Sequence, residues 1–190
     1  MKKSTNPISS FWLSKRQAKA LRMITGGRLL DIGSRSERIR PDAISLDIDR
    51  EVRPDVCASA EYLPFKSDSF DYISMLEVVE HLEEDQLERA LEESKRVGNY
   101  LVLSTPNCDS RVWNRIVWPL WSHTVGREWI GAHKQFFRKR TLAELLERVF
   151  GMKILEMNYS RWNLLLLAQT NPLPLSSAHE WTMELSPEIG

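Results

Sequence analysis

The stretch LLDIGSRSER (29–38) has the pattern of a buried strand that runs into a tight turn. Two leucines, an aspartate and an isoleucine form an apolar run too short for a helix, and Gly33 follows where the chain must turn. A loop that cradles a nucleotide usually carries more glycine, whereas Arg35 and Glu37 occupy the next alternate positions here. The stretch predicts the first strand and first loop of an α/β fold, and it raises the question of which cofactor that loop binds.

Further strands are predicted from short apolar runs along the rest of the chain. Four of these runs are AISLDI (43–48), DVCAS (55–59), FDYISML (70–76) and NYLVLSTPN (99–107). Nearly continuous apolar strands of this kind are covered on both faces, as in a parallel sheet. The segments MKILEMNYS (152–160) and WNLLLLAQT (162–170) are separated by a short turn and predict a terminal antiparallel hairpin.

Helices are predicted between the strands from apolar spacing and from capping patterns. The segment EDQLERALEESKRV (84–97) places its apolar residues at helical spacing. A capping-box pattern at Ser14 predicts a helix from about Lys15 to Thr25, and a second pattern predicts a helix that opens at Thr141. Strands that alternate with helices and end in a hairpin predict a three-layer α/β fold with a mostly parallel sheet.

The early crossovers are shortened, because parallel strands usually need a connection of about 10–12 residues that includes a helix. Ten residues separate the first two predicted strands, which leaves room for one or two helical turns. Six residues separate the second strand from the third, and no helix is expected there. We expect one domain over residues 1–170 and a loosely held tail at 171–190.

Composition limits the classes of function. Hydrophobic residues make up 42% of the chain, charged residues 27%, and the net charge is zero, so no global field attracts nucleic acid or membrane. Cys57 and Cys108 form no CxxC motif, and His123 and His133 lack ligand partners at metal spacing, so no metal site is predicted. No apolar run reaches the ~20 residues of a membrane helix or forms a signal peptide, and a cytoplasmic location is expected.

Five segments, in order, resemble a class I S-adenosylmethionine-dependent methyltransferase, most closely the broad type 11 group. They are LLDIG, SLDID, ASAEYLPFKSDSFDYISMLEVVEHL, LVLSTPN and HKQFFRKRTLAELLERVFGMKI. The resemblance extends from about Arg28 to Gln169. The resemblance implies a Rossmann-like sheet and S-adenosylmethionine as cofactor. The distance of 14 positions from Gly33 to Asp47 is shorter than the ~20 of the usual dinucleotide pattern and disfavours NAD.

The resemblance also implies which residues bind this cofactor, at the carboxyl ends of the strands. The first loop would hold the methionine half, and an acid after the second strand would accept both ribose hydroxyls. A loop after the third strand would contact adenine, and the end of the fourth would border the transferable methyl group. The implied cofactor-binding residues are Asp31, Gly33, Ser34, Asp47, Ile48, Ala60, Glu61 and Leu76. Asp49 is a rival of Asp47 for the ribose, and Ser59 stands where the family often has an acid.

His81, in EVVEHL, is the candidate catalytic residue. An acceptor hydroxyl or ammonium group must lose a proton, and an imidazole with a pKa of ~6.5 suits that step. The alternative is a histidine that orients its own loop through a hydrogen bond. A broader alternative is a non-catalytic S-adenosylmethionine-binding or interaction module with a degenerate cofactor loop, suggested by Arg35, Glu37 and Ser59.

A tryptophan-rich insertion at about 108–140 would form a cap over the substrate. It holds four of the seven tryptophans, and residues 111–140 carry seven basic residues and one acid, a local charge of +6. This composition suits a small or lipid-like acceptor. The same composition would suit binding of nucleic acid, a partner that we expect less than a small or lipid-like molecule. A further alternative is a cap that only packs on the sheet. Residues 77–93 carry a local charge of −7, and could meet the basic segment within the molecule or across a homodimer.

Overall fold

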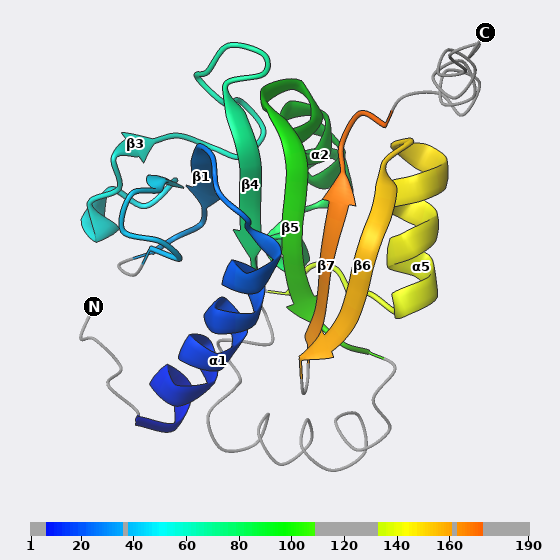
Figure 1. The fold of residues 1–190 in the computed structure, drawn as a ribbon, viewed down its shortest axis with the longest axis horizontal. Helices are drawn as coiled ribbons and strands as arrows, with labels where there is room; N and C mark the ends of the chain where they lie inside the picture. The colour runs from blue at the N-terminus through cyan, green and yellow to red at the C-terminus, as the bar shows by residue number, and fades with distance from the viewer. Residues whose placement is uncertain (1–6, 36–37, 109–132, 161–162, 173–190) are drawn as a thin grey trace, which may run out of the picture.

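The computed structural model describes residues 7–35, 38–108, 133–160 and 163–172, which form a seven-stranded sheet between helices (Figure 1). The strands are β1 (Leu29–Ile32), β2 (Ile44–Asp47), β3 (Val56–Cys57), β4 (Phe70–Leu76), β5 (Gly98–Pro106), β6 (Lys153–Ser160) and β7 (Asn163–Gln169). The helices are α1 (Pro7–Met23), α2 (Glu84–Val97) and α5 (Lys139–Glu144). Single turns η1 (Arg50–Val52) and η2 (Val79–His81) and a π-helical turn, η4 (Leu145–Val149), complete the described elements.

The sheet has the strand order β3-β2-β1-β4-β5-β7-β6. The first five strands are parallel, and β7 pairs antiparallel with β5. The antiparallel pairing of β6 with β7 confirms the predicted terminal hairpin. The strand order reverses between β1 and β4, which are hydrogen-bonded neighbours with Ile32 opposite Met75. In open α/β sheets ligands bind at the carboxyl ends of the strands beside such a reversal.

Helices cover both faces of the sheet and give it the expected three layers. In Figure 1, α1 lies on one face, and α2 and α5 lie on the other. The buried side chains divide accordingly into two clusters. One joins Ala20 and Met23 of α1 to Tyr72 and Val102, and the other joins the apolar stripe of α2 to α5, η4 and the opposite face of the strands.

The helix α2 has the bounds that apolar spacing predicts, but the two other helix starts were predicted wrongly. The helix α1 begins at Pro7, so the Ser14 pattern lies inside a helix that has already started. The helix α5 begins at Lys139, and Thr141 is its third residue. The Thr141 hydroxyl accepts the backbone N–H of Arg138 at 3.0 Å and so closes the capping box from within the helix.

Turns replace helices in the two short crossovers. Between β1 and β2 the described residues contain no helix, and the backbone N–H of Ile39 donates to the Asp31 carboxylate at 2.9 Å. Between β2 and β3 the expectation of no helix needs correction, because the 3₁₀ turn η1 fits within three residues. The strand β3 has only two residues, both paired with β2. Among the helices that the structure describes, none combines the length and hydropathy needed to cross a bilayer.

Candidate active site

Gly33 forms the turn at the end of β1 and brings it against the segment that follows β4. Its backbone N–H donates to the carbonyl of Leu46 at 2.8 Å, and its φ of +70° lies in the left-handed region that favours glycine. A Cβ atom at this position would lie 2.5 Å from Cγ2 of Val78. The missing side chain of Gly33 therefore makes room for Val78, and the two loops pack together at this point.

Asp47 ends β2 and connects the loops on either side of it. The side chain is buried, with one carboxylate oxygen accepting the backbone N–H of Arg35 and the other that of Asp49, each at 3.0 Å. A carboxylate offers about four lone-pair positions, so two of them remain for further donors. The rival carboxylate of Asp49 accepts the backbone N–H of Glu51 at 2.9 Å and caps η1. This geometry favours Asp47 over Asp49 as an acceptor for a ligand.

Two exposed side chains flank this acid. Ile48 is 73% exposed, an unusual position for a large apolar side chain directly beside a carboxylate. Arg35 is exposed, with its backbone at φ +49°, so its side chain lies in solvent, away from the interior of the loop. Glu37 lies outside the described residues. Arg35, the one of these two charged residues that the structure describes, therefore does not bury its side chain in the loop.

Asp31 stabilises the first loop through the hydrogen bonds of its buried carboxylate. It is 4% exposed, accepts the Ser74 hydroxyl at 2.5 Å with one oxygen, and accepts the backbone N–H of Ile39 with the other. Burial raises the pKa of Asp31, and the bonds from Ser74 and Ile39 partly oppose that rise. Both carboxylate oxygens thus have partners within the protein, and Asp31 holds the shortened crossover in place.

The remaining predicted residues lie at or near the same edge. Ser34 is buried directly after Gly33, and Leu76 is partly buried at the end of β4. Ala60 is buried in the loop that follows β3. The structure therefore brings Gly33, Ser34, Asp47 and Leu76 to the carboxyl edge of the sheet.

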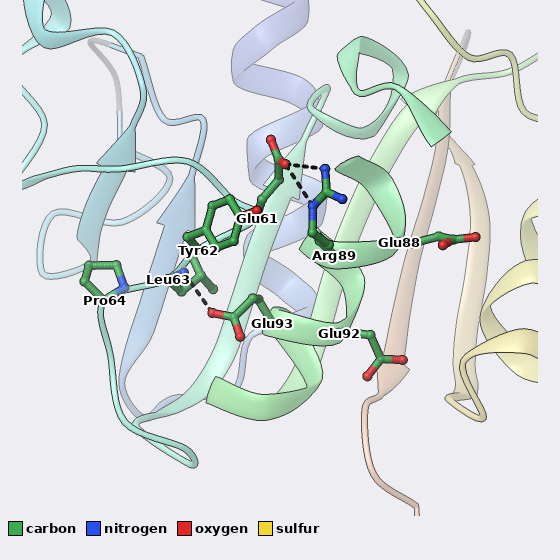
Figure 2. A pocket seen from close by; sticks show the side chains of 8 residues that line it. All are labelled: Glu61, Tyr62, Leu63, Pro64, Glu88, Arg89, Glu92 and Glu93. Carbon is green, nitrogen blue, oxygen red and sulfur yellow. Dashed lines mark hydrogen bonds and ion pairs between the residues drawn. The ribbon is translucent and has the colours of Figure 1, made fainter. Parts of the chain in front are cut away.

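Glu61 has a different environment, shown in Figure 2. Its carboxylate accepts Nε and Nη2 of Arg89 at 3.1 and 2.9 Å and the Gln86 amide at 2.9 Å, so its side chain is attached to α2. The Ser59 hydroxyl donates to the same group at 3.2 Å. An open groove of about 690 Å³ runs beside this ion pair, lined by Glu61, Tyr62, Leu63, Pro64, Glu88, Arg89, Glu92 and Glu93. This groove lies along α2, away from the reversal of strand order, so it is not the candidate cofactor site.

Glu77 joins four elements directly after β4. Its carboxylate accepts the Ser104 hydroxyl of β5 at 3.0 Å and the Asn163 amide of β7, and its other oxygen lies 3.4 Å from Nη1 of Arg16 in α1. Its backbone has a φ of +61°, a conformation that is strained for a residue other than glycine. Strain held by several partners is typical of functional sites.

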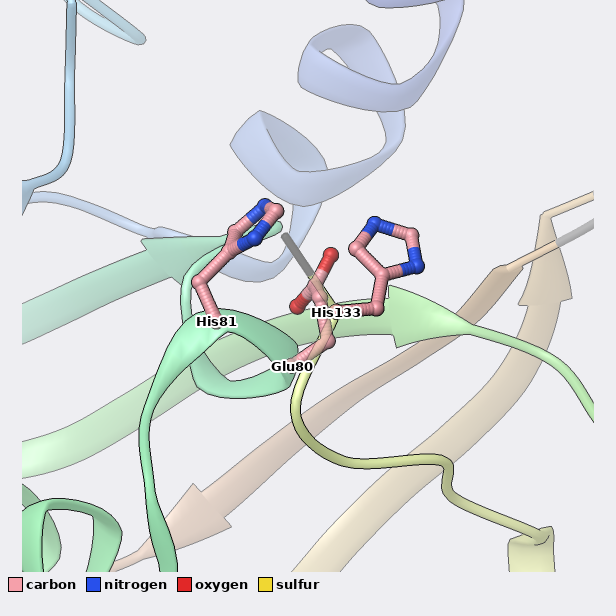
Figure 3. A group of neighbouring side chains, drawn as sticks. All are labelled: Glu80, His81 and His133. Atoms are coloured by element: carbon pink, nitrogen blue, oxygen red, sulfur yellow. The ribbon is translucent and has the colours of Figure 1, made fainter. Parts of the chain in front are cut away.

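Glu80, His81 and His133 lie close together at the next turn (Figure 3). Glu80 is 1% exposed, and burial, reinforced by the neighbouring Glu77, raises its pKa to about 9. Arg16 and the Thr105 hydroxyl oppose this shift. The imidazole rings of His81 and His133 have centroids 4.9 Å apart, and burial together with His81 lowers the pKa of His133.

Backbone contacts explain how His133 reaches this turn. The N–H groups of Lys134 and Gln135 donate to the Glu80 carbonyl at 2.7 and 3.1 Å. The Lys134 ammonium also lies 3.0 Å from the Glu83 carboxylate, so the basic and acidic stretches meet within one molecule at this point. Most of the predicted tryptophan-rich cap, residues 109–132, lies outside the described residues.

A comparison with protein families identifies the chain. Residues 9–156 match a family described as a methyltransferase domain. The chain belongs to this methyltransferase family. Its sheet has the class I, Rossmann-like architecture, and the cofactor of such methyltransferases is S-adenosylmethionine. Among curated proteins, none matches this sequence.

Solved structures similar to this methyltransferase share its fold at low sequence identity. A SAM-dependent methyltransferase from Thermotoga maritima has a TM-score of 0.63 and 20% identity, covering 84% of this chain and 89% of its own. One from Archaeoglobus fulgidus has a TM-score of 0.59 and 18% identity, covering 83% and 93%. The small RNA methyltransferase HEN1 has a TM-score of 0.61 and 16% identity, covering 84% of this chain and 25% of its own. At these identities the likeness shows the fold alone.

The residues of the methyltransferase fit S-adenosylmethionine at the carboxyl edge. The buried carboxylate of Asp47 retains lone pairs for ribose hydroxyls, and the exposed Ile48 beside it offers apolar surface for an adenine ring. Both lie next to the Gly33 turn, where the strand order reverses. The Glu61 side chain fits less well, because its carboxylate is already bound to α2.

Sequence reasoning missed the surroundings of the candidate base. It assigned no partner to His133, and the structure brings that residue beside His81 through backbone bonds to Glu80. It likewise gave no role to Arg16, which lies beside Glu77. Neither contact leaves a local signal, because both join segments far apart in the chain.

Proposed function

We propose that this methyltransferase transfers the methyl group of S-adenosylmethionine to a small or lipid-like acceptor. The observation that carries the proposal is the position of Asp47 and Ile48 at the carboxyl end of β2, bonded to the turn that follows β1 beside the reversal of strand order. When bound, S-adenosylmethionine supplies an already activated sulfonium methyl group. The chain's own residues then need to bind, orient and exclude water, which is catalysis by proximity.

The proposed roles follow from the contacts of each side chain. Asp47 accepts the ribose hydroxyls with its remaining lone pairs, and Ile48 packs against the adenine. The backbone of Gly33 and Ser34 faces the methionine half, and Leu76 borders the methyl group. The backbone of Ala60 and Glu61 contacts the adenine edge. Asp31 acts indirectly, because it fixes the loop through Ile39.

His81 is proposed as the residue that handles the proton of an acceptor hydroxyl or ammonium group. It lies in the turn η2 that follows β4, with its ring centroid 4.9 Å from that of His133. Support for a small or lipid-like acceptor comes from the tryptophans at 113, 118, 121 and 129 in the sequence. The ends of that segment are anchored at this edge, since the Cys108 N–H donates to the Phe137 carbonyl at 3.1 Å.

Cofactor binding is tested first, by calorimetry with S-adenosylhomocysteine. We expect saturable binding to the wild type, a loss of about tenfold or more in Asp47→Ala, and little change in Asp49→Ala, a matched loss of a neighbouring carboxylate. Absence of binding to the wild type would overturn the assignment of the cofactor to this edge.

Methyl transfer is tested next, with labelled S-adenosylmethionine and separate pools of small metabolites, lipids and RNA. Label in the metabolite or lipid pool supports the proposal. Label in RNA alone would overturn the acceptor class, and cofactor binding without transfer to any pool would favour the non-catalytic binding module instead.

A further inference from the structure

We propose that Glu80, His81 and His133 bind a divalent transition-metal ion. One potential ligand atom from each residue lies within 4.8 Å of those of the other two (Figure 3). Two imidazole nitrogens and one carboxylate oxygen are the ligand set of many zinc and other first-row transition-metal sites. The proposal goes beyond methyl transfer. With the ion bound, a ring nitrogen of His81 would be a metal ligand, so His81 would not serve at the same time as the proton acceptor proposed above. Metal binding can be measured without any methyl acceptor.

The environment of Glu80 supplies a second, independent observation. The side chain is 1% exposed, and neither of its carboxylate oxygens accepts a hydrogen bond of ordinary geometry. Burying a carboxyl group without such partners is costly, so most buried carboxylates are paired or coordinate a metal. A cation held between Glu80 and the two imidazoles would satisfy these oxygens.

The backbone holds the three residues in place before any ion binds. Glu80 and His81 are neighbours in the turn η2, and the segment that carries His133 is bonded to the Glu80 carbonyl through Lys134 and Gln135. Tetrahedral ligands at about 2.1 Å from zinc lie roughly 3.4 Å apart. Side-chain movements of about 1 Å would therefore bring the three ligand atoms to the spacing that a bound ion requires. The two histidines are only partly buried, which leaves room for such rotations.

The coordination that results would be incomplete. Three protein ligands leave at least one position for water or another molecule, as in catalytic rather than structural metal sites. Imidazole nitrogen favours Zn²⁺ and Fe²⁺ over Mg²⁺ and Ca²⁺, which prefer sites made of oxygen. Mn²⁺ also suits oxygen ligands and is the weakest binder among the first-row divalent transition metals, but it accepts nitrogen ligands more readily than Mg²⁺ does. We therefore expect the protein to bind Zn²⁺ and Mn²⁺ more tightly than Mg²⁺.

The test is titration of the metal-stripped full chain with Zn²⁺, Mn²⁺ and Mg²⁺ by calorimetry. We expect one tight site for Zn²⁺ or Mn²⁺, weakened at least tenfold in Glu80→Gln and in His133→Ala. Glu83→Gln is the matched control, because Glu83 lies three residues from Glu80 but pairs with Lys134. Equal weakening in the control, or affinity unchanged in both variants of the site, would overturn the proposal.

A spectroscopic measurement on the wild type keeps the test independent of variant folding. Pulsed electron paramagnetic resonance of bound Mn²⁺ should detect coupling to imidazole nitrogen, and Mn²⁺ bound without nitrogen coupling would refute this ligand set. Circular dichroism of each variant checks that it is folded. Because S-adenosylhomocysteine binding is measured separately, failure of the metal site and failure of the cofactor site give different results.

Discussion

The carboxylate of Asp47 accepts the backbone N–H of Arg35 at 3.0 Å, so the end of β2 is attached to the turn after β1. Its second oxygen accepts the N–H of Asp49. One buried acid therefore bonds to the backbone of both loops. The backbone of Arg35 adopts the left-handed conformation, while its side chain extends to solvent.

We expect Asp47→Ala to lower both stability and cofactor affinity. Loss of its two hydrogen bonds should reduce the free energy of unfolding by about 1–3 kcal/mol, because two backbone donors lose their partner. Asp49→Ala removes only the cap of η1 and should lower stability by about 1 kcal/mol. Urea denaturation and calorimetry with S-adenosylhomocysteine measure the two effects. If Asp49→Ala lost as much affinity as Asp47→Ala, the choice between these acids would be reversed.

Gly33→Ala should destabilise the protein through both conformation and packing. The left-handed backbone disfavours alanine by about 1–2 kcal/mol, and the contact with Val78 should add about 1–3 kcal/mol. Gly151→Ala is a matched control, since Gly151 has a similar φ of +64° and no atom within 4 Å of an added Cβ. Thermal denaturation should therefore give a clearly lower melting temperature for Gly33→Ala than for Gly151→Ala.

The variant Val78→Ala separates the packing contribution to this destabilisation from the conformational contribution. In the double variant Gly33→Ala/Val78→Ala the smaller side chain makes room for the new Cβ, so the losses should be less than additive by about 1 kcal/mol. Strict additivity would mean that Val78 does not fill the space above Gly33.

The ion pair between Arg89 and Glu61 should contribute more than an exposed pair. Glu61 is mostly buried, with 11% of its side chain exposed, and receives two hydrogen bonds from the guanidinium. Arg89→Ala should lower stability more than the loss of a fully exposed ion pair does, because the mostly buried Glu61 loses its charged partner. Arg140→Ala breaks an exposed pair with Glu144 and should change stability by less than about 0.5 kcal/mol. Equal effects in the two variants would show that the burial of Glu61 adds nothing.

Asp31 should make stability fall as the pH rises. Burial raises the pKa of Asp31 in the folded protein above the ordinary value of an aspartate, so the folded state binds this proton more tightly than the unfolded state does. The contribution is complete below the unfolded pKa and is lost as the pH rises through the folded pKa. Relative to Asp31→Asn, the wild type should therefore lose stability from pH 4 upward. Denaturation curves of both proteins across this range measure the difference, and parallel pH profiles would contradict it.

Local patterns were sufficient for elements whose structure depends on neighbouring residues. The apolar spacing of 84–97 predicted α2, and the run at 70–76 predicted β4, because periodic burial is recorded in the residues themselves. The starts of α1 and α5 were wrong because a capping pattern also occurs inside a helix or three residues into one. The two-residue β3 is stabilised by pairing with β2, which short runs do not reveal.

For the candidate cofactor-binding residues too, the sequence indicated their positions in the fold but not their partners. A position at the end of a strand indicated Gly33 and Asp47, since the carboxyl ends of parallel strands meet at one edge. The partners of these residues were not visible in the sequence. The attachment of Glu61 to Arg89, and of Asp31 to Ser74, joins segments about 30 to 40 positions apart.

The sequence by itself determined the order of strands and helices along the chain and the acids that end the strands, because these depend on short-range periodicity and spacing. The family followed from the resemblance of five segments that occur in order. Only the tertiary structure decided which buried groups meet. It placed Val78 over Gly33 and His133 beside Glu80 and His81. The physical reason is that crossovers and backbone bonds, such as those from Lys134 and Gln135 to Glu80, bring distant segments together without leaving a local pattern.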